Sequence, residues 1–232
     1  MNVCVIPARG GSKRIPRKNI KSFCGVPMIA YSIKVALASE CFDKVIVSTD
    51  DMEIADVARS YGAEVPFIRP PHLSDDFTGT IPVVKHAIEW LIDHQIVPNN
   101  VCCLYATAPF VQANSIRQAL AKMQASLADY CFSVTSYAFP IQRAIQVNPN
   151  DRVEMFSLDN FNQRSQDLEE AFHDAGQFYW GTAQAWLQEK VLFSEVSLPY
   201  VLPRYLVQDI DTKEDWIRAE LMYQALCQQG IL

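Results

Sequence analysis

A loop that combines glycine with clustered positive charge follows the first apolar run of the chain, Val3–Pro7. Gly10 and Gly11 are adjacent in this loop. Between residues 9 and 21 the chain carries six basic residues and no acidic one: Arg9, Lys13, Arg14, Arg17, Lys18 and Lys21. Paired glycines let a backbone approach a ligand closely, and exposed amides with arginine and lysine heads suit phosphate. The pattern favours a polyphosphate site over an ordinary solvated basic loop.

A pair of carboxylates near the end of the sequence offers a second chemical group. In an extended segment, Asp209 and Asp211 point to one side and Ile210 points to the other. Carboxylates held that close repel each other unless a proton or a cation compensates them. Magnesium is commonly held by one or two carboxylates together with substrate phosphates. One aspartate could instead cap the following helix, but Thr212 is the better cap, so we predict Mg²⁺ bound by Asp209 and Asp211.

Together, the basic loop and the carboxylate pair predict phosphoryl chemistry. Such chemistry relies on positioning and charge neutralisation, with little covalent work by the protein. The loop is not a Walker A motif, because no Gly-Lys-Ser/Thr follows a four-residue spacer. It also lacks Gly-x-Gly-x-x-Gly, so a dinucleotide oxidoreductase is poorly supported.

The elements that must position these groups alternate between strand-like and helix-like patterns. Alternation with crossover helices indicates a three-layer α/β fold, a mostly parallel sheet with helices on both faces. The predicted strands are Val3–Pro7, Val45–Val47, Val65–Ile68, Val101–Tyr105, Tyr130–Thr135 and Gly176–Trp180. Two predicted helices begin at Pro27 and Thr80, and two more follow the capping patterns Asp50–Glu53 and Thr212–Asp215. The remaining two span Ile116–Met123 and Thr182–Glu189. Ligands of such sheets bind beyond the carboxyl ends of the strands, where the basic loop lies.

The alternating pattern is interrupted after Ser136. The following segment is polar and rich in turns, with short strand-like pieces at Ala144–Val147 and Val153–Phe156, and an extended run recurs at Arg204–Asp211. We interpret residues 137–170 as an insertion that projects from the sheet and not as a second independent domain. The whole chain, 1–232, is then a single domain.

Composition limits the classes of protein that need considering. Half of the residues are hydrophobic and the net charge is −6, which suits a well-packed domain and argues against non-specific nucleic-acid binding. No apolar run approaches the roughly 20 residues that cross a bilayer. The seven cysteines are scattered and never spaced Cys-x-x-Cys, which is typical of reduced cysteines used as small apolar residues. We therefore expect a cytoplasmic protein without membrane or nucleic-acid partners.

The basic loop resembles a known family signature. Ile6–Asn19 is similar to the nucleotide-binding motif of the CMP-sialic acid synthetase (acylneuraminate cytidylyltransferase) family. The similarity continues over essentially the whole chain, through Val47–Asp50, Arg69-Pro70, Leu104–Pro109 and Asp209–Thr212. Within the family, Thr78–Trp90 and Arg164–Gly181 look most like the pseudaminic acid cytidylyltransferases. The resemblance implies a nucleotide-diphospho-sugar transferase-like fold.

This resemblance implies a reaction and a set of residues. The anomeric hydroxyl of a nine-carbon 2-keto sugar acid attacks the α-phosphate of CTP, with Mg²⁺ as cofactor and a homodimer as the working form. The catalytic residues would be Arg9, Lys18 and Asp211. The CTP-binding residues would be Ala8, Arg9, Gly10, Gly11, Ser12, Lys18, Asn19, Arg69, Thr80 and Thr107. The sugar-binding residues would be Tyr105, Arg143, Arg164, His173, Gln177 and Tyr179. Both arginines would come from the insertion at 137–170, of this chain or of a partner subunit, which would serve dimerisation and sugar binding.

Two departures from the sialic acid branch favour a different sugar. Tyr105-Ala106-Thr107 stands where that branch has Gln-Pro-Thr, and His173–Gly176 stands where it has an arginine and Pro-Asn-Gly. These positions lie near the sugar in the family, so pseudaminic acid is the favoured substrate. The alternatives are sialic, legionaminic or 3-deoxy-octulosonic acid, a nucleotidyltransferase for a sugar 1-phosphate, and a non-catalytic nucleotide-binding module.

Overall fold

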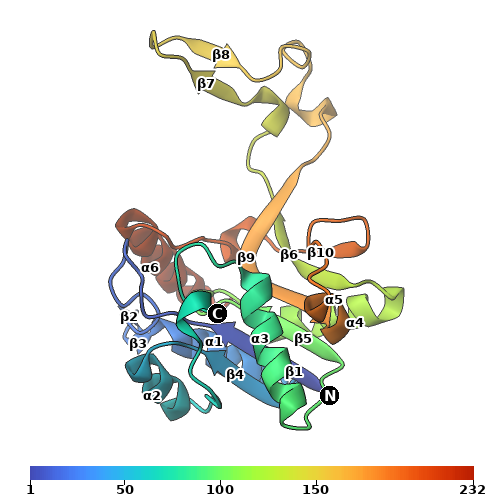
Figure 1. The fold of residues 1–232 in the computed structure, drawn as a ribbon. Coiled ribbons are helices and arrows are strands. Elements are labelled where there is room, and N and C mark those ends of the chain that lie inside the picture. Colours follow the sequence, from blue (N-terminus) through green and yellow to red (C-terminus); the bar gives the residue numbers. More distant parts are fainter.

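A six-stranded sheet forms the centre of the computed structural model, which describes residues 1–232 (Figure 1). In spatial order the strands are β10 (Ser197–Val201), β6 (Tyr130–Ser136), β9 (Phe172–Thr182), β5 (Asn100–Leu104), β1 (Asn2–Pro7) and β4 (Lys44–Ser48). Neighbouring strands are parallel except that β9 runs antiparallel to both β5 and β6. The expected mostly parallel sheet is confirmed.

Helices cover both faces of the sheet. They are α1 (Met28–Ser39), α2 (Met52–Ser60), α3 (Thr80–Asp93), α4 (Ala113–Ser126), α5 (Ala183–Leu187) and α6 (Lys213–Gln228). Single 3₁₀ turns occupy Pro71–Leu73, Ile141–Arg143, Ser165–Asp167 and Arg204–Leu206. None of the helices combines the length and the apolar character that crossing a bilayer requires.

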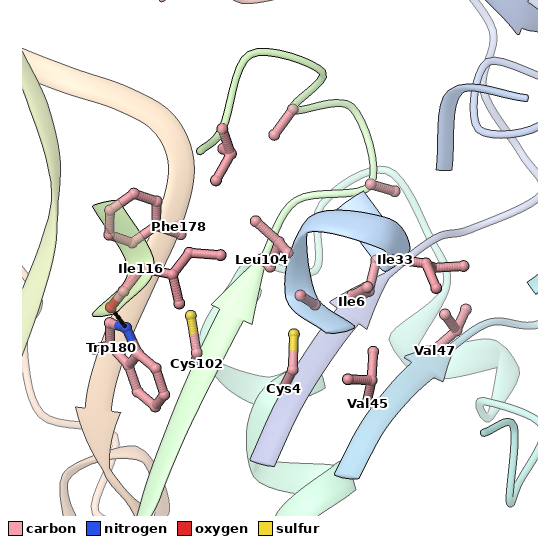
Figure 2. Close-up of a cluster of buried hydrophobic side chains, with 14 of the residues drawn as sticks. Cys4, Ile6, Ile33, Val45, Val47, Cys102, Leu104, Ile116, Phe178 and Trp180 are labelled. Atoms are coloured by element: carbon pink, nitrogen blue, oxygen red, sulfur yellow. Dashed lines mark hydrogen bonds between the residues drawn. The ribbon is translucent and has the colours of Figure 1, made fainter. Parts of the chain in front are cut away.

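The side chains of each strand alternate between two cores. Cys4 and Ile6 of β1 join a cluster beneath α1, α2 and α4, while Val3 and Val5 face a second cluster beneath α3 and α5. Figure 2 shows the first cluster, in which the Trp180 indole Nε1–H donates to the backbone oxygen of Ile116 at 3.0 Å. The two cores confirm the predicted three-layer arrangement.

A third, aromatic cluster anchors α6 beside the basic loop. Phe23 packs edge-on against Trp216 and Tyr223 of α6, with ring centroids 5.5 and 5.6 Å apart. Phe23 lies in the two-residue strand β2 (Ser22–Phe23), which pairs with β3 (Val26–Pro27). The end of the basic loop is therefore packed against the helix that follows Asp211.

Several predicted elements require correction. Val65–Ile68 is not a strand; only Glu64 bridges to Ile46, because Pro66 has no N–H for a ladder. Strand β10 was not predicted, since Pro199 weakens its pattern, but an edge strand tolerates proline. The run Arg204–Asp211 starts with a 3₁₀ turn and is not extended throughout.

The helix boundaries also differ in detail. Asp51, not Asp50, caps α2, and Pro27 precedes α1 as its cap residue and is not its first helical residue. Helix α5 is shorter than predicted and α4 is longer. The Thr212–Asp215 cap of α6 is confirmed as a capping box, because each side chain binds the other's backbone N–H.

Residues 137–171 connect β6 to β9 and project away from the sheet (Figure 1). We call this segment the arm. Its outer part is a hairpin of β7 (Ile145–Val147) and β8 (Val153–Met155). Most of the large apolar side chains of the arm are exposed, among them Phe139, Ile145, Val147, Val153, Phe156, Leu158 and Phe161.

Candidate active site

A cavity of about 520 Å³ lies beyond the carboxyl ends of β1 and β5. We call it the first cavity. Its lining combines the basic loop, the start of α3 and the loop after β5, and the residues are Pro7, Arg9, Ser12, Lys13, Arg14, Lys18, Asn19, Arg69, Asp76, Thr78, Gly79, Thr80, Val83, Tyr105, Ala106, Thr107 and Asp211. Five of these residues are basic and two are acidic, so the first cavity suits an anion.

Asp76 holds two cations of the basic loop. The Arg9 guanidinium donates to the Asp76 carboxylate at 2.6 Å and to the Asp75 backbone oxygen at 2.7 Å. Lys13 also donates to Asp76. Hydrogen bonds from Lys13 and Arg9 lower the pKa of Asp76. These exposed pairs are weak enough for a phosphate to replace the carboxylate.

Asp211 plays a similar part on the other side of the first cavity. Lys18 Nζ donates to the Ile210 backbone oxygen at 2.8 Å and to Asp211 Oδ1 at 3.3 Å. Arg14 Nη2 lies 2.7 Å from Asp211 Oδ2. Asp211 is thus held by two basic side chains of the basic loop at the wall of the first cavity.

The backbone of the basic loop is fixed by polar side chains beneath it. Gly10 N–H donates to Asp50 Oδ1 at 2.9 Å, and Asn19 Nδ2 donates to the Arg9 backbone oxygen at 2.9 Å. A Cβ at Gly10 would lie 2.7 Å from Asp51 Oδ2, whereas a Cβ at Gly11 meets nothing within 4 Å. A side chain at position 10 would therefore collide with Asp51, whereas a side chain at position 11 would enter open space.

Arg69 is a buried cation with unused hydrogen-bond donors. Its side chain is 4% exposed, and its Nε and Nη2 have no hydrogen-bond partner. The nearest carboxylate, Asp50, lies 3.8 Å away. Burial lowers the pKa of Arg69, although Asp50 opposes this shift. A buried donor on the wall of a cavity indicates a ligand oxygen as its partner.

The carboxylate pair fits a magnesium site of the kind that substrate completes. Partial burial of its carboxylate raises the pKa of Asp209, and the nearby charge of Asp211 raises it further. The residue as a whole is nevertheless exposed. Only Asp211 lines the first cavity, and no group of three or more His, Cys, Asp or Glu side chains could hold a metal alone. Asp209 and Asp211 lie next to the basic loop and are carboxylates of the kind that hold magnesium together with substrate phosphates, although Asp211 is paired with Lys18 and Arg14 in this structure.

A second cavity of about 480 Å³ adjoins the first. The two share Gly79, Thr80 and Tyr105, and the remaining lining residues of the second are Ile81, Pro82, Asp174, Tyr179, Glu189, Leu192 and Phe193. The Thr80 and Tyr105 hydroxyls lie 2.8 Å apart. The Tyr179 hydroxyl donates to Asp174 Oδ2 at 2.6 Å. Two ligands bound in these cavities would meet at Thr80 and Tyr105.

The structure brings most of the sequence-predicted residues together. Arg9, Ser12, Lys18, Asn19, Arg69, Thr80, Thr107 and Asp211 line the first cavity, Tyr179 lines the second and Tyr105 lines both. Ala8, Gly10, Gly11 and Asp209 belong to the same loops but not to the lining. Ala8 is fully buried and donates its N–H to Ser48, behind the cavity wall.

Four predicted sugar-binding residues lie outside both cavities. Gln177 is buried and donates to the Leu206 backbone oxygen at 2.6 Å, so it ties β9 to the turn before Asp209. The His173 ring lies against Tyr137, and its Nδ1 is 2.8 Å from the Asp174 backbone oxygen. Arg143 and Arg164 are in the arm, where they contact Ser165 and Asp167. These arginines do not reach the cavities of their own chain.

Several lining residues were not predicted from the sequence. Lys13, Arg14 and Asp76 line the first cavity, and Asp174, Glu189, Leu192 and Phe193 line the second. Lys13 and Arg14 stand in the basic run and could have been chosen from it. No sequence signal distinguishes Asp76 from other exposed acids, whereas Asp174 belongs to the His173–Gly176 run that the family resemblance already associates with the sugar.

Comparisons with known proteins agree with this geometry. A family model described as Cytidylyltransferase matches residues 3–198. The chain is 49% identical over 223 residues to a pseudaminic acid cytidylyltransferase of Campylobacter jejuni, which covers 96% of each protein. It is 32% identical to a CMP-N,N'-diacetyllegionaminic acid synthase of Legionella pneumophila, again over 96% of each.

A solved structure shares the fold. It is a CMP:2-keto-3-deoxy-manno-octonic acid synthetase complexed with CTP, which superposes with a TM-score of 0.69 at 18% identity. The match covers 97% of this chain and 99% of that one. The residues 3–198 that the family model matches include β1, the basic loop, α3 and β9, which supply part of the lining of both cavities, while Asp211 lies beyond them. The chain therefore belongs to the cytidylyltransferase family.

Proposed function

We propose that this enzyme transfers CMP from CTP to the anomeric hydroxyl of pseudaminic acid and releases pyrophosphate. The observation that carries the proposal is the meeting of a cation-lined cavity with a second, mixed polar and apolar cavity at Thr80 and Tyr105. The choice of sugar is supported by the 49% identity to the Campylobacter jejuni relative over nearly the full length of both proteins.

In the proposed reaction, the triphosphate lies in the first cavity. Arg9, Lys13 and Lys18 exchange their bonds to Asp76 and Asp211 for bonds to phosphate oxygens. The sugar hydroxyl attacks the α-phosphorus and its proton passes to water, while the bond between the α-phosphorus and the bridging oxygen of the β-phosphate breaks and releases pyrophosphate. Lys18 and Arg9 then stabilise the charge on the departing pyrophosphate.

The proposed cofactor is Mg²⁺, which Asp209 and Asp211 would hold. When bound, it would neutralise negative charge on the reacting phosphates. Asp211 is already within 3.3 Å of Lys18, so a single side chain can link the metal site to the triphosphate-binding lysine. We assign nucleotide binding to Arg69 as well, because it lines the first cavity and its buried Nε and Nη2 have no hydrogen-bond partner.

We also propose that two copies of the chain assemble through the arm. The arm exposes large apolar side chains that a single copy does not cover, including Ile145, Val147 and Phe156. It also carries Arg143 and Arg164, which lie away from both cavities of their own chain. A partner's arm could supply these cations to the sugar carboxylate. We place the reaction in the cytoplasm, which suits a protein whose seven cysteines are all free.

The experiment that tests the reaction is a nucleotide comparison. The protein is incubated with magnesium, with CTP, UTP or GTP, and with either pseudaminic acid or a sugar 1-phosphate, and both pyrophosphate and the mass of the nucleotide-sugar are measured. We expect both products with CTP alone. Binding of CTP without pyrophosphate release would favour a binding module, and activity with UTP and a sugar 1-phosphate would favour a different nucleotidyltransferase.

A further inference from the structure

A bulge in β9 brings two distant residues of the strand together. In a regular strand, Asp174 and Tyr179 would point to opposite faces and lie roughly 16 Å apart. Against β6, however, Phe132 pairs with Tyr179 and Val134 pairs with Asp174, so β9 bulges between these positions. Gly176, with φ of +61°, sits in the bulge. As a result, the Tyr179 hydroxyl reaches Asp174 at 2.6 Å.

The Asp174 carboxylate is fixed from two sides. Tyr179 donates to Oδ2, and the Gly176 N–H donates to Oδ1 at 2.9 Å. Tyr179 is 2% exposed, and burial, followed by the nearby Tyr105 and Asp174, raises its pKa strongly. Tyr179 therefore keeps its proton and donates it to Asp174. Each carboxylate oxygen retains a lone pair, so Asp174 can accept further hydrogen bonds from the second cavity.

The second cavity contains no basic residue in its lining. Its two acids are Asp174 and Glu189, and Glu189 is paired with Lys85 outside the lining. Asp174 has only neutral donors, so its charge is uncompensated. The first cavity carries an excess of basic over acidic residues. A molecule that spans both cavities thus experiences positive charge at one end and negative charge at the other.

We propose that Asp174 is a positioning residue that orients the sugar acid, an inference that rests on the proposed function. In a 2-keto sugar acid, the carboxylate is attached to the anomeric carbon that must reach the α-phosphate. Asp174 disfavours this carboxylate in the second cavity and accepts hydrogen bonds from hydroxyl or acylamino N–H donors at the far end of the sugar. The anomeric hydroxyl then faces the nucleotide.

The test compares Asp174→Asn with the wild type. Asparagine keeps the size of the side chain but removes its charge and one acceptor. We expect kcat/KM for pseudaminic acid to fall about 10-fold to 100-fold, the loss expected for a hydrogen bond to a charged group. The KM for CTP, and CTP binding measured by calorimetry, should change less than about 2-fold, because the first cavity is untouched.

Two further variants sharpen the result. Tyr179→Phe removes the hydroxyl that holds Asp174 and should lower kcat/KM for the sugar acid in the same direction, again without weakening CTP binding. Asp56→Asn, which removes an exposed acid of α2 paired with Arg59, is the matched control and should leave all constants unchanged.

An unchanged kcat/KM for the sugar acid in Asp174→Asn would overturn the inference while leaving the proposed function intact. Equal loss of CTP binding would also overturn it, because Asp174 would then be structural. If the wild type itself releases no pyrophosphate with any nonulosonic acid, the proposed function is wrong and the inference fails with it.

Discussion

The charged side chains that line the first cavity form ion pairs with one another. Arg9 and Lys13 hold Asp76, while Arg14 and Lys18 hold Asp211. When an anionic ligand binds, these basic side chains can replace their bonds to Asp76 and Asp211 by bonds to the ligand. Few charges then lack an opposite charge at any stage, which avoids the free-energy cost of uncompensated charge. Arg69 is the exception, because its buried Nε and Nη2 have no hydrogen-bond partner in the protein and can donate to a ligand oxygen.

Lys18→Ala tests the exchange directly. The substitution removes a donor to Ile210 and Asp211 and the proposed contact with the triphosphate. We expect kcat/KM for CTP to fall about 10-fold to 100-fold, as for the loss of a charge-assisted hydrogen bond. The control is Lys21→Ala in the same loop, whose ammonium lies over the Trp216 ring instead. Steady-state kinetics that show equal losses in both variants would contradict a specific role for Lys18.

The two loop glycines provide a second prediction at this scale. Gly10→Ala places a Cβ 2.7 Å from Asp51 Oδ2 and should lower the melting temperature. Gly11→Ala meets nothing within 4 Å, so its melting temperature should equal that of the wild type while its KM for CTP rises. The measurements are the melting temperature and the KM for CTP of each variant, compared with the wild type. Normal CTP kinetics in Gly11→Ala would show that no ligand approaches the backbone there.

At the scale of elements, the pattern of the sequence predicts the helices and the central strands well. Alternation in β1 and the Thr212 capping box are local signals, and both appear in the structure. The failures involve competing signals: Pro66 lies within an apolar run that forms no strand, and Pro199 lies within an edge strand that does form.

The site was predictable where its residues cluster in sequence and not where tertiary geometry assembles it. The basic loop is a continuous run, so Arg9 and Lys18 were found. Asp174 lines the second cavity only because of the bulge at Gly176, and no pattern in the sequence marks that bulge. Gln177, conversely, is in the correct strand but is buried against Leu206.

Asp51 connects the basic loop to α2 and gives a prediction about pH. It caps α2 through the Ile54 N–H and accepts hydrogen bonds from Arg17, which lower its pKa to about 2. Because the native pKa lies below the unfolded value of about 4, the stabilisation is present above pH 4 and is lost as the pH falls through 2. Asp51→Ala should therefore reduce the free energy of unfolding by about 1 kcal/mol at pH 7.

The measurement is urea unfolding at neutral and acidic pH. The difference between Asp51→Ala and wild type should shrink as the pH falls from about 4 toward 2. Asp56→Ala in the same helix is the control, with an expected change within about 0.5 kcal/mol for an exposed surface site. A difference that stays constant with pH would show that the Asp51 charge contributes nothing.

At the scale of the whole molecule, the arm is the part whose purpose a single copy does not explain. Val147 and Val153 lie directly opposite each other in the β7–β8 hairpin, and their side chains are 65% and 66% exposed. Such an apolar pair is costly to leave in water and suits a surface that a second copy covers.

Lysine at both positions should therefore produce monomers. We expect the double variant Val147→Lys, Val153→Lys to sediment as a single chain while the wild type sediments as a dimer. Its kcat/KM for the sugar acid should fall, because Arg143 and Arg164 of the arm no longer reach a partner. The control is Gln146→Lys, which adds charge to the opposite face of the same hairpin. A wild type that is already monomeric would contradict the proposed assembly.

The most direct test of the account is pyrophosphate release from CTP and magnesium, with pseudaminic acid and N-acetylneuraminic acid assayed side by side. The account predicts rapid release with pseudaminic acid and little or none with N-acetylneuraminic acid. Release only with N-acetylneuraminic acid would keep the reaction but contradict the substrate. Release with neither acid would contradict the central claim, which is that CTP and the sugar acid bind in the two cavities and react there.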